Sequence, residues 1–436
     1  MILRIHHYPS KSADARLNQI AGRKLTCSRK DELQVLQILE AVRTRGDDAL
    51  MAYVRQFDSP ELDIASIRVT AAEFQEAERA VSDAFRESLE RAQRQIEEFH
   101  RMQAPHSRML TGREGVVTGQ IVHPVDAAGI YVPGGQGGKT PLVSSVLMGA
   151  VPARIAGVKR RIMATPADRQ GRVNPHLLVA AAVSGIHDVF KIGSAWAIAA
   201  MAFGTASIDR CDVIVGPGNT YVTLAKKLVS GMVGIDMIAG PSEILILADE
   251  TARPDHAAAD MLSQAEHDRV ASAVLITPSK PLAASVLMEI EEQLSELARK
   301  DIARESLHRF GAVFTVPDMK TALTLANRIA PEHLELLVEH PFDLISEIRH
   351  AGAVFMGHYT PEPMGDYIAG PNHVLPTAGS ARFSSALSVD HFVKKTSMIY
   401  YSREAFRREA PHVMRLAETE GLGAHARSVS VRLNEG

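Results

Sequence analysis

The chain has 436 residues, 48 Lys and Arg against 51 Asp and Glu, and a formal net charge of −3 with neutral histidines. This balance excludes the polycationic surface that holds nucleic acid through its phosphates. Two cysteines, Cys27 and Cys211, exclude a disulfide framework and a cysteine-built zinc site. The start lacks the apolar core of a signal peptide, and no run reaches the ~18 apolar residues of a membrane span. We expect a soluble, cytoplasmic protein without nucleic-acid or membrane partners.

The first part of the chain is short and polar, then helical. Residues 1–25 are predicted to form an N-terminal arm. Thr70 and Glu73 have the spacing of a capping box, which opens an apolar stripe that continues to Phe99. This stripe predicts one core-facing helix of about seven turns.

After residue 119 the periodicity changes, and short apolar runs alternate with helical stretches. A first set of predicted strands comprises Ile130–Val132, Ile162–Ala164, Val189–Ile192, Val213–Val215 and Ile244–Leu247. A second set comprises Ala273–Ile276, Ala312–Val316 and Ala353–Met356. The alternation favours parallel βαβ units in two α/β bodies. From about residue 390 the pattern is helical, with a helix at Arg403–Glu420 and a short tail.

Two glycine-rich turns follow predicted strands. Gly134–Thr140 nearly has the P-loop sequence, but Pro133 stands where that motif requires glycine. The apolar strand that ends at Asp249 would suit a magnesium site, so nucleoside-triphosphate hydrolysis stays an alternative. Gly216–Asn219 opens a helix whose N-terminus could bind pyrophosphate. At both places the residues alone favour a plain strand-to-helix turn over a phosphate site.

Gln264 and His267 stand three residues apart in a predicted helix, and thus on one face. An amide oxygen and an imidazole can both bind a divalent metal, and zinc needs about four ligands. Asp366 and His425 are candidates for the remainder. A solvated helix face with one histidine is the other interpretation.

Glu332 and His333 follow Pro331, which predicts the first turn of a helix. The positive helix end would disfavour imidazolium and keep His333 able to accept a proton. Two such groups suit a reaction with two proton transfers. An ordinary acidic helix start is the alternative.

These fragments together resemble the histidinol dehydrogenase family over nearly the whole chain. The resemblance is carried by Tyr131–Gly135, Ser144–Met148, Gly216–Asn219, Ala239–Glu243, Gln264–His267, Ala330–Leu334, Gly365–Tyr367, Asn372–Thr377, and Glu420–Leu422 with His425. It implies oxidation of L-histidinol through an aldehyde to L-histidine, the last steps of histidine biosynthesis, with two NAD+ reduced.

The resemblance also implies roles for individual residues. One zinc ion per subunit would be held by Gln264, His267 and Asp366, together with His425 of the partner subunit. His333 would be the base in both oxidations, and Glu332 would activate water for attack on the aldehyde. The substrate would be held by Ser242, Glu420, His333 and the metal ligands, and NAD by Tyr131 and Asn219.

Two segments depart from the family pattern. Trp196 stands where the family has a glutamine that contacts the cofactor. The Trp196 ring either stacks on NAD in place of that contact or packs in the protein core. The stretch Gln136–Thr140 also differs from the family at the cofactor loop. We expect altered NAD affinity with unaltered chemistry.

The predicted architecture is a domain-swapped α/β homodimer with two Rossmann-like bodies. Residues 26–130 and 242–387 would form the larger, metal-binding body, 131–241 an inserted NAD-binding body, and 388–436 a tail that crosses to the partner. Three alternatives stay open: a relative that oxidises another amino alcohol or diol, a P-loop-like NTPase, and a non-catalytic assembly protein.

Overall fold

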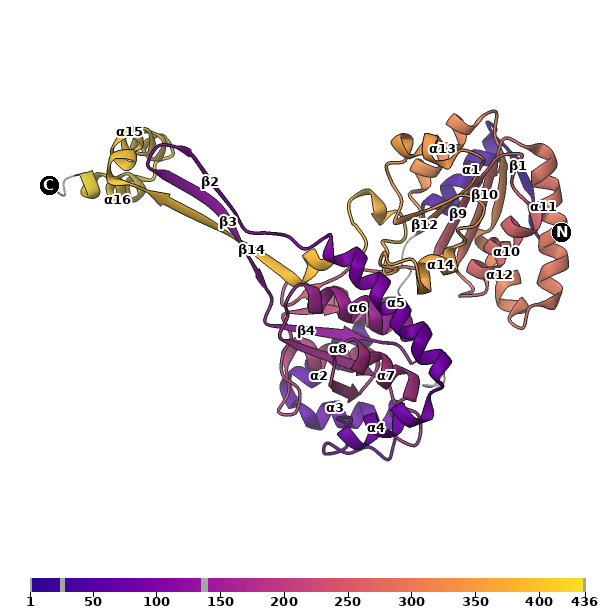
Figure 1. The fold of residues 1–436 in the computed structure, drawn as a ribbon, viewed down its shortest axis with the longest axis horizontal. Helices are drawn as coiled ribbons and strands as arrows, with labels where there is room; N and C mark the ends of the chain where they lie inside the picture. Colours follow the sequence, from indigo (N-terminus) through magenta and orange to yellow (C-terminus); the bar gives the residue numbers. More distant parts are fainter. Residues whose placement is uncertain (1, 24–27, 135–139, 434–436) are drawn as a thin grey trace. The chain divides into compact units, whose positions relative to one another are not determined.

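The computed structural model describes residues 2–23, 28–134 and 140–433. The chain divides into two compact units, Met1–Gln103 with Asp126–Phe392, and Ala104–Val125 with Val393–Gly436. The first unit contains two parallel sheets with helices on their faces, as Figure 1 shows. This confirms the predicted α/β fold. No helix among the described residues has the length and apolar composition that a membrane crossing requires.

The five-stranded sheet has the strand order β6-β5-β4-β7-β8, and all its pairs are parallel. Its strands are β4 (Ala127–Tyr131), β5 (Arg160–Thr165), β6 (Asp188–Lys191), β7 (Val213–Val215) and β8 (Gly234–Ile235). The helices between and beside them are α2 (Arg29–Arg45), α3 (Asp47–Tyr53), the π-helix Val54–Asp58, α4 (Ala71–Ala80), α5 (Asp83–Arg101), α6 (Val143–Ile155), α7 (Pro175–Val183), α8 (Ser194–Phe203) and α9 (Thr220–Val229).

The six-stranded sheet has the order β1-β11-β10-β9-β12-β13, again all parallel. Its strands are β1 (Ile5–His7), β9 (Glu243–Ala248), β10 (Ser272–Thr277), β11 (Ala312–Thr315), β12 (His333–Leu337) and β13 (Ala353–Met356). Its helices are α1 (Lys11–Ala21), α10 (Pro254–Ala265), α11 (Lys280–Glu296), α12 (Lys300–Phe310), α13 (Met319–Ile329) and α14 (Glu362–Tyr367). Short 3-10 turns occupy Pro341–Glu347, Ser380–Arg382 and Val389–Phe392.

Strand β9 explains why the sequence shows continuous apolar runs. Ile244 and Ile246 pack into the core on the side of α10 and α11, while Leu245 and Leu247 pack on the side of α1 and α13. Successive residues of a strand point to opposite faces, and here both faces are covered by helices. A strand buried on both faces therefore loses the polar alternation of a half-exposed strand.

The second unit is an antiparallel sheet followed by two helices. Its elements are β2 (Arg108–Arg113), β3 (Val116–Pro124), β14 (Val393–Tyr401), α15 (Arg403–Thr419) and α16 (Gly423–Leu433). Its buried apolar residues are few and mostly alanines: Val116, Ala405, Ala410, Ala417 and Ala426.

Two predicted helical regions differ from the structure. The single helix expected from Thr70 is two helices, because Val81 is extended and Ser82 caps a new helix by accepting from the Phe85 N–H. Residues 393–401, expected to begin a helical region, form β14 because they pair along their whole length with β3.

Sheet membership also differs from the predicted domain boundaries. Residues 5–7 pair with β11, so the expected N-terminal arm is the edge of the six-stranded sheet. Helix α2, expected in the metal-binding body, packs against α8 and α9 of the five-stranded sheet. Its buried residues Val35 and Ile38 belong to the core that contains Trp196.

Candidate active site

The predicted catalytic and metal-ligating residues of the first unit lie at three places around the six-stranded sheet. These are the amino end of β12 (Glu332 and His333), the carboxyl end of α10 (Gln264 and His267) and α14 (Asp366). Glu243 begins β9, and His333 begins β12. The two strands are neighbours, with His333 in register with Ile244. Ligands of parallel sheets usually bind outside the carboxyl ends. This group of residues lies at the opposite edge.

His333 is a buried imidazole with a defined hydrogen on one nitrogen. Its Nδ1 lies 2.9 Å from the main-chain oxygen of Glu243. A carbonyl only accepts, so Nδ1 carries the hydrogen and Nε2 is free to accept a proton. Burial lowers the pKa of His333 to about 4, while the charge of Asp366 opposes this shift. The imidazole is therefore neutral at physiological pH.

The predicted helix start at Glu332–His333 is wrong, because His333 is already in strand β12. Helix α13 ends at Ile329, and Ala330 adopts a left-handed conformation with φ of 55°. Pro331 then leads into the strand rather than into a helix. Burial, and not a helix terminus, accounts for the neutral imidazole.

Glu332 is a buried carboxyl beside this imidazole. Its Oε2 accepts a hydrogen bond of 2.9 Å from the Glu243 N–H and lies 3.8 Å from His333 Nδ1. Burial raises the pKa of Glu332 well above its ordinary value, and the nearby acids Glu243, Asp366 and Glu362 add to this. A carboxyl of this kind keeps its proton to a higher pH than an ordinary glutamate, and it can take part in proton transfer.

Helix α14 places two acids beside His333. Ligand atoms of His333, Glu362 and Asp366 lie within 4.8 Å of one another, a geometry that could hold a metal ion. Asp366 Oδ1 lies 3.4 Å from His373 Nδ1. Burial raises the pKa of Glu362 to about 8, and the neighbouring charge of Asp366 contributes to this rise.

Gln264 offers the clearest sign of an absent ligand. The residue is 2% exposed, and its Oε1 has no hydrogen-bond partner among the described residues. Buried polar atoms are nearly always paired, so this oxygen points to a group bound from outside. Helix α10 ends at Ala265, two residues before His267, but the His267 N–H still donates to the Gln264 carbonyl at 3.3 Å. His267 acts electrostatically on His333, so these side chains share one neighbourhood. Amide oxygen, imidazole and carboxylate together fit zinc.

A cavity of about 300 Å³ opens beside these residues. Its polar lining includes His333, Asp366, His373 and Asn372, and its apolar lining includes Phe355. This size and mixture suit a small polar molecule with one apolar face.

Sequence reasoning did not single out several acids around the site. Glu243 and Glu362 stand within or next to motifs but look like ordinary strand and helix termini. Glu335, fully buried on β12, accepts from the Glu362 N–H at 2.8 Å and is hydrogen-bonded to Asp260. The one sign in the sequence that could have indicated Glu335 was a glutamate within an otherwise apolar stretch of the strand. His373 lies within a quoted motif, yet nothing local marked it as a neighbour of Asp366.

The other predicted substrate residues lie in different places. Ser242 immediately precedes β9, and its carbonyl accepts from the Ser272 N–H at 3.1 Å. Glu420 ends α15, and His425 lies on α16. Both are exposed residues of the second unit. Their contribution to the metal and substrate site stays a prediction.

The predicted NAD residues lie at the carboxyl edge of the five-stranded sheet. Tyr131 ends β4, and its hydroxyl accepts from the Ser194 N–H at 3.0 Å. Asn219 caps α9 by accepting from the Val222 N–H at 3.1 Å. Strands β4 and β7 are adjacent, and the chain leaves this pair in opposite directions across the sheet. Such a switch point is where doubly wound sheets bind nucleotides.

Gly216 makes the approach of these two loops possible. A Cβ at this position would lie 2.0 Å from the main-chain oxygen of Tyr131, and its φ is +119°. The carbonyl of Gly216 accepts from the buried Lys226 at 2.8 Å, and Lys226 is paired with Asp236. The second predicted phosphate loop is therefore a rigid turn.

Trp196 is mainly a packing residue. It is 6% exposed, and its indole N–H donates to Asp58 at 2.8 Å. Its ring stacks near Tyr53 and Phe57, with centroids 5.8 and 5.3 Å away. It also lines a cavity of about 420 Å³ with Ser194. The other unusual segment, Gln136–Thr140, lies outside the described residues except for Thr140.

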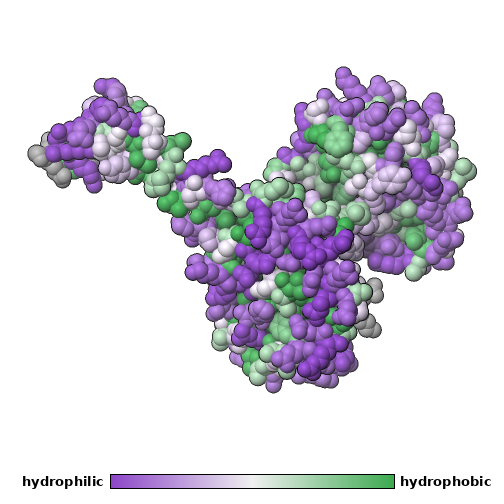
Figure 2. Space-filling model, viewed as in Figure 1, coloured by the Kyte–Doolittle hydropathy of each residue, from purple (hydrophilic) through white to green (hydrophobic). Residues whose placement is uncertain are grey.

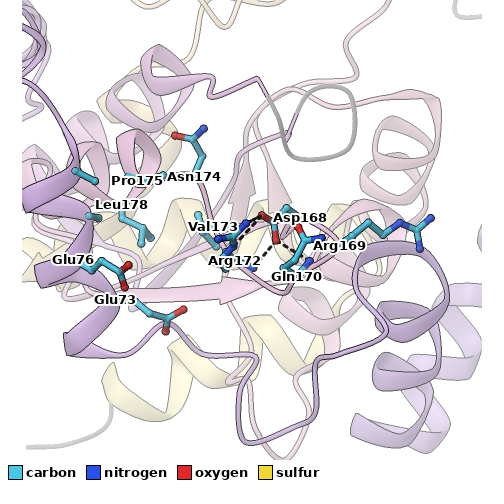
Figure 3. A pocket seen from close by; sticks show the side chains of 12 residues that line it. Glu73, Glu76, Asp168, Arg169, Gln170, Arg172, Val173, Asn174, Pro175 and Leu178 are labelled. Carbon is cyan, nitrogen blue, oxygen red and sulfur yellow. Dashed lines mark hydrogen bonds and ion pairs between the residues drawn. The ribbon is translucent and has the colours of Figure 1, made fainter.

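A larger cavity of about 770 Å³ lies between α4 and the loop before α7 (Figure 3). Its charged lining includes Glu73, Glu76 and Arg169, and Asp168 is hydrogen-bonded within its own loop. None of the predicted site residues lines it. We therefore place the chemistry at the smaller cavity.

The chain matches the profile of the histidinol dehydrogenase family over residues 23–433. It is 55% identical to histidinol dehydrogenase of Desulfotalea psychrophila over 399 residues, 92% of each chain. It is 49% identical to that of Syntrophotalea carbinolica over 434 residues and the full length of both. The crystal structure of histidinol dehydrogenase from Elizabethkingia anophelis superposes with a TM-score of 0.93 at 37% identity, covering 99% of this chain and 98% of that one. The chain belongs to the histidinol dehydrogenase family, a family of oxidoreductases.

Proposed function

We propose that the chain oxidises L-histidinol through L-histidinaldehyde to L-histidine and reduces two NAD+. The observation that carries this proposal is a neutral imidazole and a proton-binding carboxyl held side by side, together with an unpaired amide oxygen three residues from His267, which acts electrostatically on that imidazole. His333, Glu332 and Gln264 supply these three groups. Membership of the family supplies the substrate.

The two catalytic residues would act on different protons. His333 Nε2 would accept the hydroxyl proton of the alcohol and later that of the hydrated aldehyde. Glu332 would accept a proton from the water that adds to the aldehyde carbon. When bound, zinc anchors the substrate nitrogens and NAD+ takes up one hydride in each oxidation.

We propose Gln264, His267 and Asp366 as zinc ligands, with His425 of the partner subunit as the fourth. Asp366 also belongs to the group formed with His333 and Glu362. We favour the first group because Gln264 Oε1 has no hydrogen-bond partner in the part of the chain that the structure describes. A metal on His333 would also occupy the one ring nitrogen that can accept a proton. Ser242 and Glu420 would help to hold the substrate.

The five-stranded sheet would bind NAD+ at the switch point between β4 and β7. Tyr131 and Asn219 lie there, and Trp196 would shape the adjoining cavity rather than stack on the cofactor. Because the reaction draws on NAD+ for amino-acid synthesis, we place the enzyme in the cytoplasm.

We propose that the enzyme is a homodimer whose second units complete the active sites. This unit exposes apolar side chains on its sheet and both helices: Met109, Leu110, Ile399, Tyr400, Val413, Leu416, Leu422 and Val431. Figure 2 shows hydrophobic surface on this unit. Patches of this kind mark protein interfaces. A second copy of the chain is the occupant that would also bring His425 to a metal site.

The experiment that tests the function is NADH formation from L-histidinol, measured with chelator and with zinc restored. We expect two NADH to form per histidinol oxidised. The activity should be lost when chelator is added and should return when zinc is restored. Simple diols in place of histidinol test the alternative substrate class, and phosphate release from ATP tests the NTPase. Turnover of a diol but not of histidinol would contradict the proposal.

A further inference from the structure

Glu243 contacts both proposed catalytic residues through its main chain. Its N–H donates to Glu332 Oε2 at 2.9 Å, and its carbonyl accepts from His333 Nδ1 at 2.9 Å. The first bond orients the carboxyl, and the second fixes the tautomer and rotation of the imidazole. The position of this one residue therefore sets the geometry of both groups.

The side chain of Glu243 is itself anchored at two points. It is 6% exposed, and its Oε1 accepts from the Ala378 N–H at 3.1 Å and from Arg23 Nη1 at 3.5 Å. These contacts join the first residue of β9 to two distant segments. Glu243 is not among the residues that line the cavity beside His333, so we assign its side chain no contact with substrate.

Arg23 is a buried cation at the other end of this contact. It is 8% exposed, and its Nη2 donates to the Val270 carbonyl at 2.6 Å. Its guanidinium lies 4.9 Å from the centre of the Phe310 ring. Burying an ion pair costs desolvation free energy, which is offset only when the pair and its hydrogen bonds are well placed. Removal of one partner leaves the other charge buried and uncompensated.

We propose that Arg23 and Glu243 form a positioning pair that holds the start of β9, so that the main chain of Glu243 can orient Glu332 and His333. The inference rests on the proposed roles of those two residues. It assigns an active-site function to a residue of the N-terminal segment, which neither motif nor spacing indicated.

The pair also sets the charge around Glu332. This carboxyl faces Glu243 from β9, Glu362 and Asp366 from α14, and His333 beside it. Arg23 also acts on it electrostatically. Loss of the negative Glu243 should stabilise the charged form of Glu332, and loss of the positive Arg23 should destabilise it.

The test compares Glu243→Gln, Arg23→Met and Arg23→Lys in the zinc-loaded full chain. We measure kcat, the KM values for histidinol, histidinaldehyde and NAD+, the zinc content, and the pH dependence of aldehyde oxidation. Arg309→Met is the matched control, because Arg309 also lies over the Phe310 ring at 5.3 Å but is paired at the surface with Glu305.

We expect Arg23→Met to lower kcat about tenfold or more in both stages, with KM for NAD+ and zinc content unchanged. Arg23→Lys should recover part of the loss, and Arg309→Met should equal wild type. The acid limb of the pH profile should move up in Arg23→Met and down in Glu243→Gln. Shifts in the same direction, or none, would overturn the proposal, as would full activity of Arg23→Met. If Arg23→Met fails to fold, Glu243→Gln decides by its downward shift of the acid limb. Arg23→Lys, which keeps the positive charge, then decides by a lowered kcat with the acid limb unmoved. Wild type without histidinol turnover would instead contradict the proposed function.

Discussion

At the scale of single residues, two neighbours in sequence acquire different chemistry from the same burial. Desolvation penalises whichever form is charged, so it lowers the pKa of the His333 imidazole and raises that of the Glu332 carboxyl. The imidazole becomes a neutral base, and the carboxyl keeps its proton to a higher pH. Pairs of titratable groups whose pKa values move in this way are typical of acid–base catalysis.

The pH dependence of aldehyde oxidation follows from these shifts. A base is active when deprotonated, so the rate should fall as the pH decreases through the raised pKa of Glu332. His333 has a pKa of about 4 and should stay neutral across that range. We predict that Glu332→Gln slows aldehyde oxidation by about 10²-fold or more and removes this acid limb.

His333→Asn is the companion variant. It should slow both oxidations by about 10²- to 10⁴-fold, because the hydroxyl proton loses its acceptor in each stage. Zinc content should not change, since His333 is not a proposed ligand. A zinc-free His333→Asn protein would contradict our choice of ligand group.

Asp58 provides a residue-scale test on the NAD side. Burial raises its pKa to about 6, although Trp196 and the Gly193 N–H donate to it. The folded state thus holds the proton more tightly than the unfolded chain, and stability falls as the pH rises through about 4 to 6. Asn cannot ionise but can accept both hydrogen bonds.

We therefore predict that Asp58→Asn gains unfolding free energy relative to wild type as the pH rises. The difference between the two proteins should grow by about 1 kcal/mol between pH 5 and pH 8. Denaturant unfolding at both pH values measures it. A constant difference would show that the Asp58 carboxyl does not titrate in this window.

At the scale of elements, two sheets that share one strand order, apart from the additional edge strand β1, use opposite edges. The five-stranded sheet presents Tyr131 and Asn219 at the carboxyl ends of its strands, near a switch point. The six-stranded sheet presents His333 and Glu243 at the amino ends. Strand order alone therefore does not locate the chemistry of the second sheet.

The turn after β7 gives an element-scale prediction. Gly216→Ala would place a methyl group against the Tyr131 carbonyl in a strained backbone conformation. We expect a loss of unfolding free energy of at least about 2 kcal/mol and weaker NAD+ binding, measured by denaturation and by fluorescence titration. Gly231→Ala is the control, since Gly231 has a φ of +93° but open space around it. Equal losses in both variants would show that backbone strain, not the close approach, is what matters.

Sequence patterns predicted the elements that bury apolar residues on both faces, such as β9 and β10, because such strands are continuous apolar runs. They failed where tertiary pairing decides the outcome. His333 follows a proline and an acid, and this local sequence favours a helix start. His333 is nevertheless in β12, because this strand pairs with β9. β14 is half exposed and pairs only with distant β3, so its local sequence does not distinguish it. The predicted site residues came from motif resemblance, whereas Glu243, Glu335 and Arg23 are joined to the site by contacts that no spacing reveals.

At the scale of the whole molecule, the second unit buries few apolar side chains and exposes many large ones. Alanines fill most of its interior, while Leu416 and Ile399 are 66% and 72% exposed. A closed two-fold dimer would bury the same patch on both copies. The proposed zinc site makes the stronger demand, since it requires His425 from the partner subunit.

The most direct test of the account is subunit complementation between two inactive variants, His267→Ala and His425→Ala. Each variant alone loses one zinc ligand at every site. In a hybrid dimer, one site combines an intact His267 with an intact His425, and the other lacks both. Equal mixing after subunit exchange should therefore restore about a quarter of the wild-type activity and zinc content. If the mixture stays as inactive and as zinc-poor as its components while hybrid dimers form, the shared metal site is contradicted.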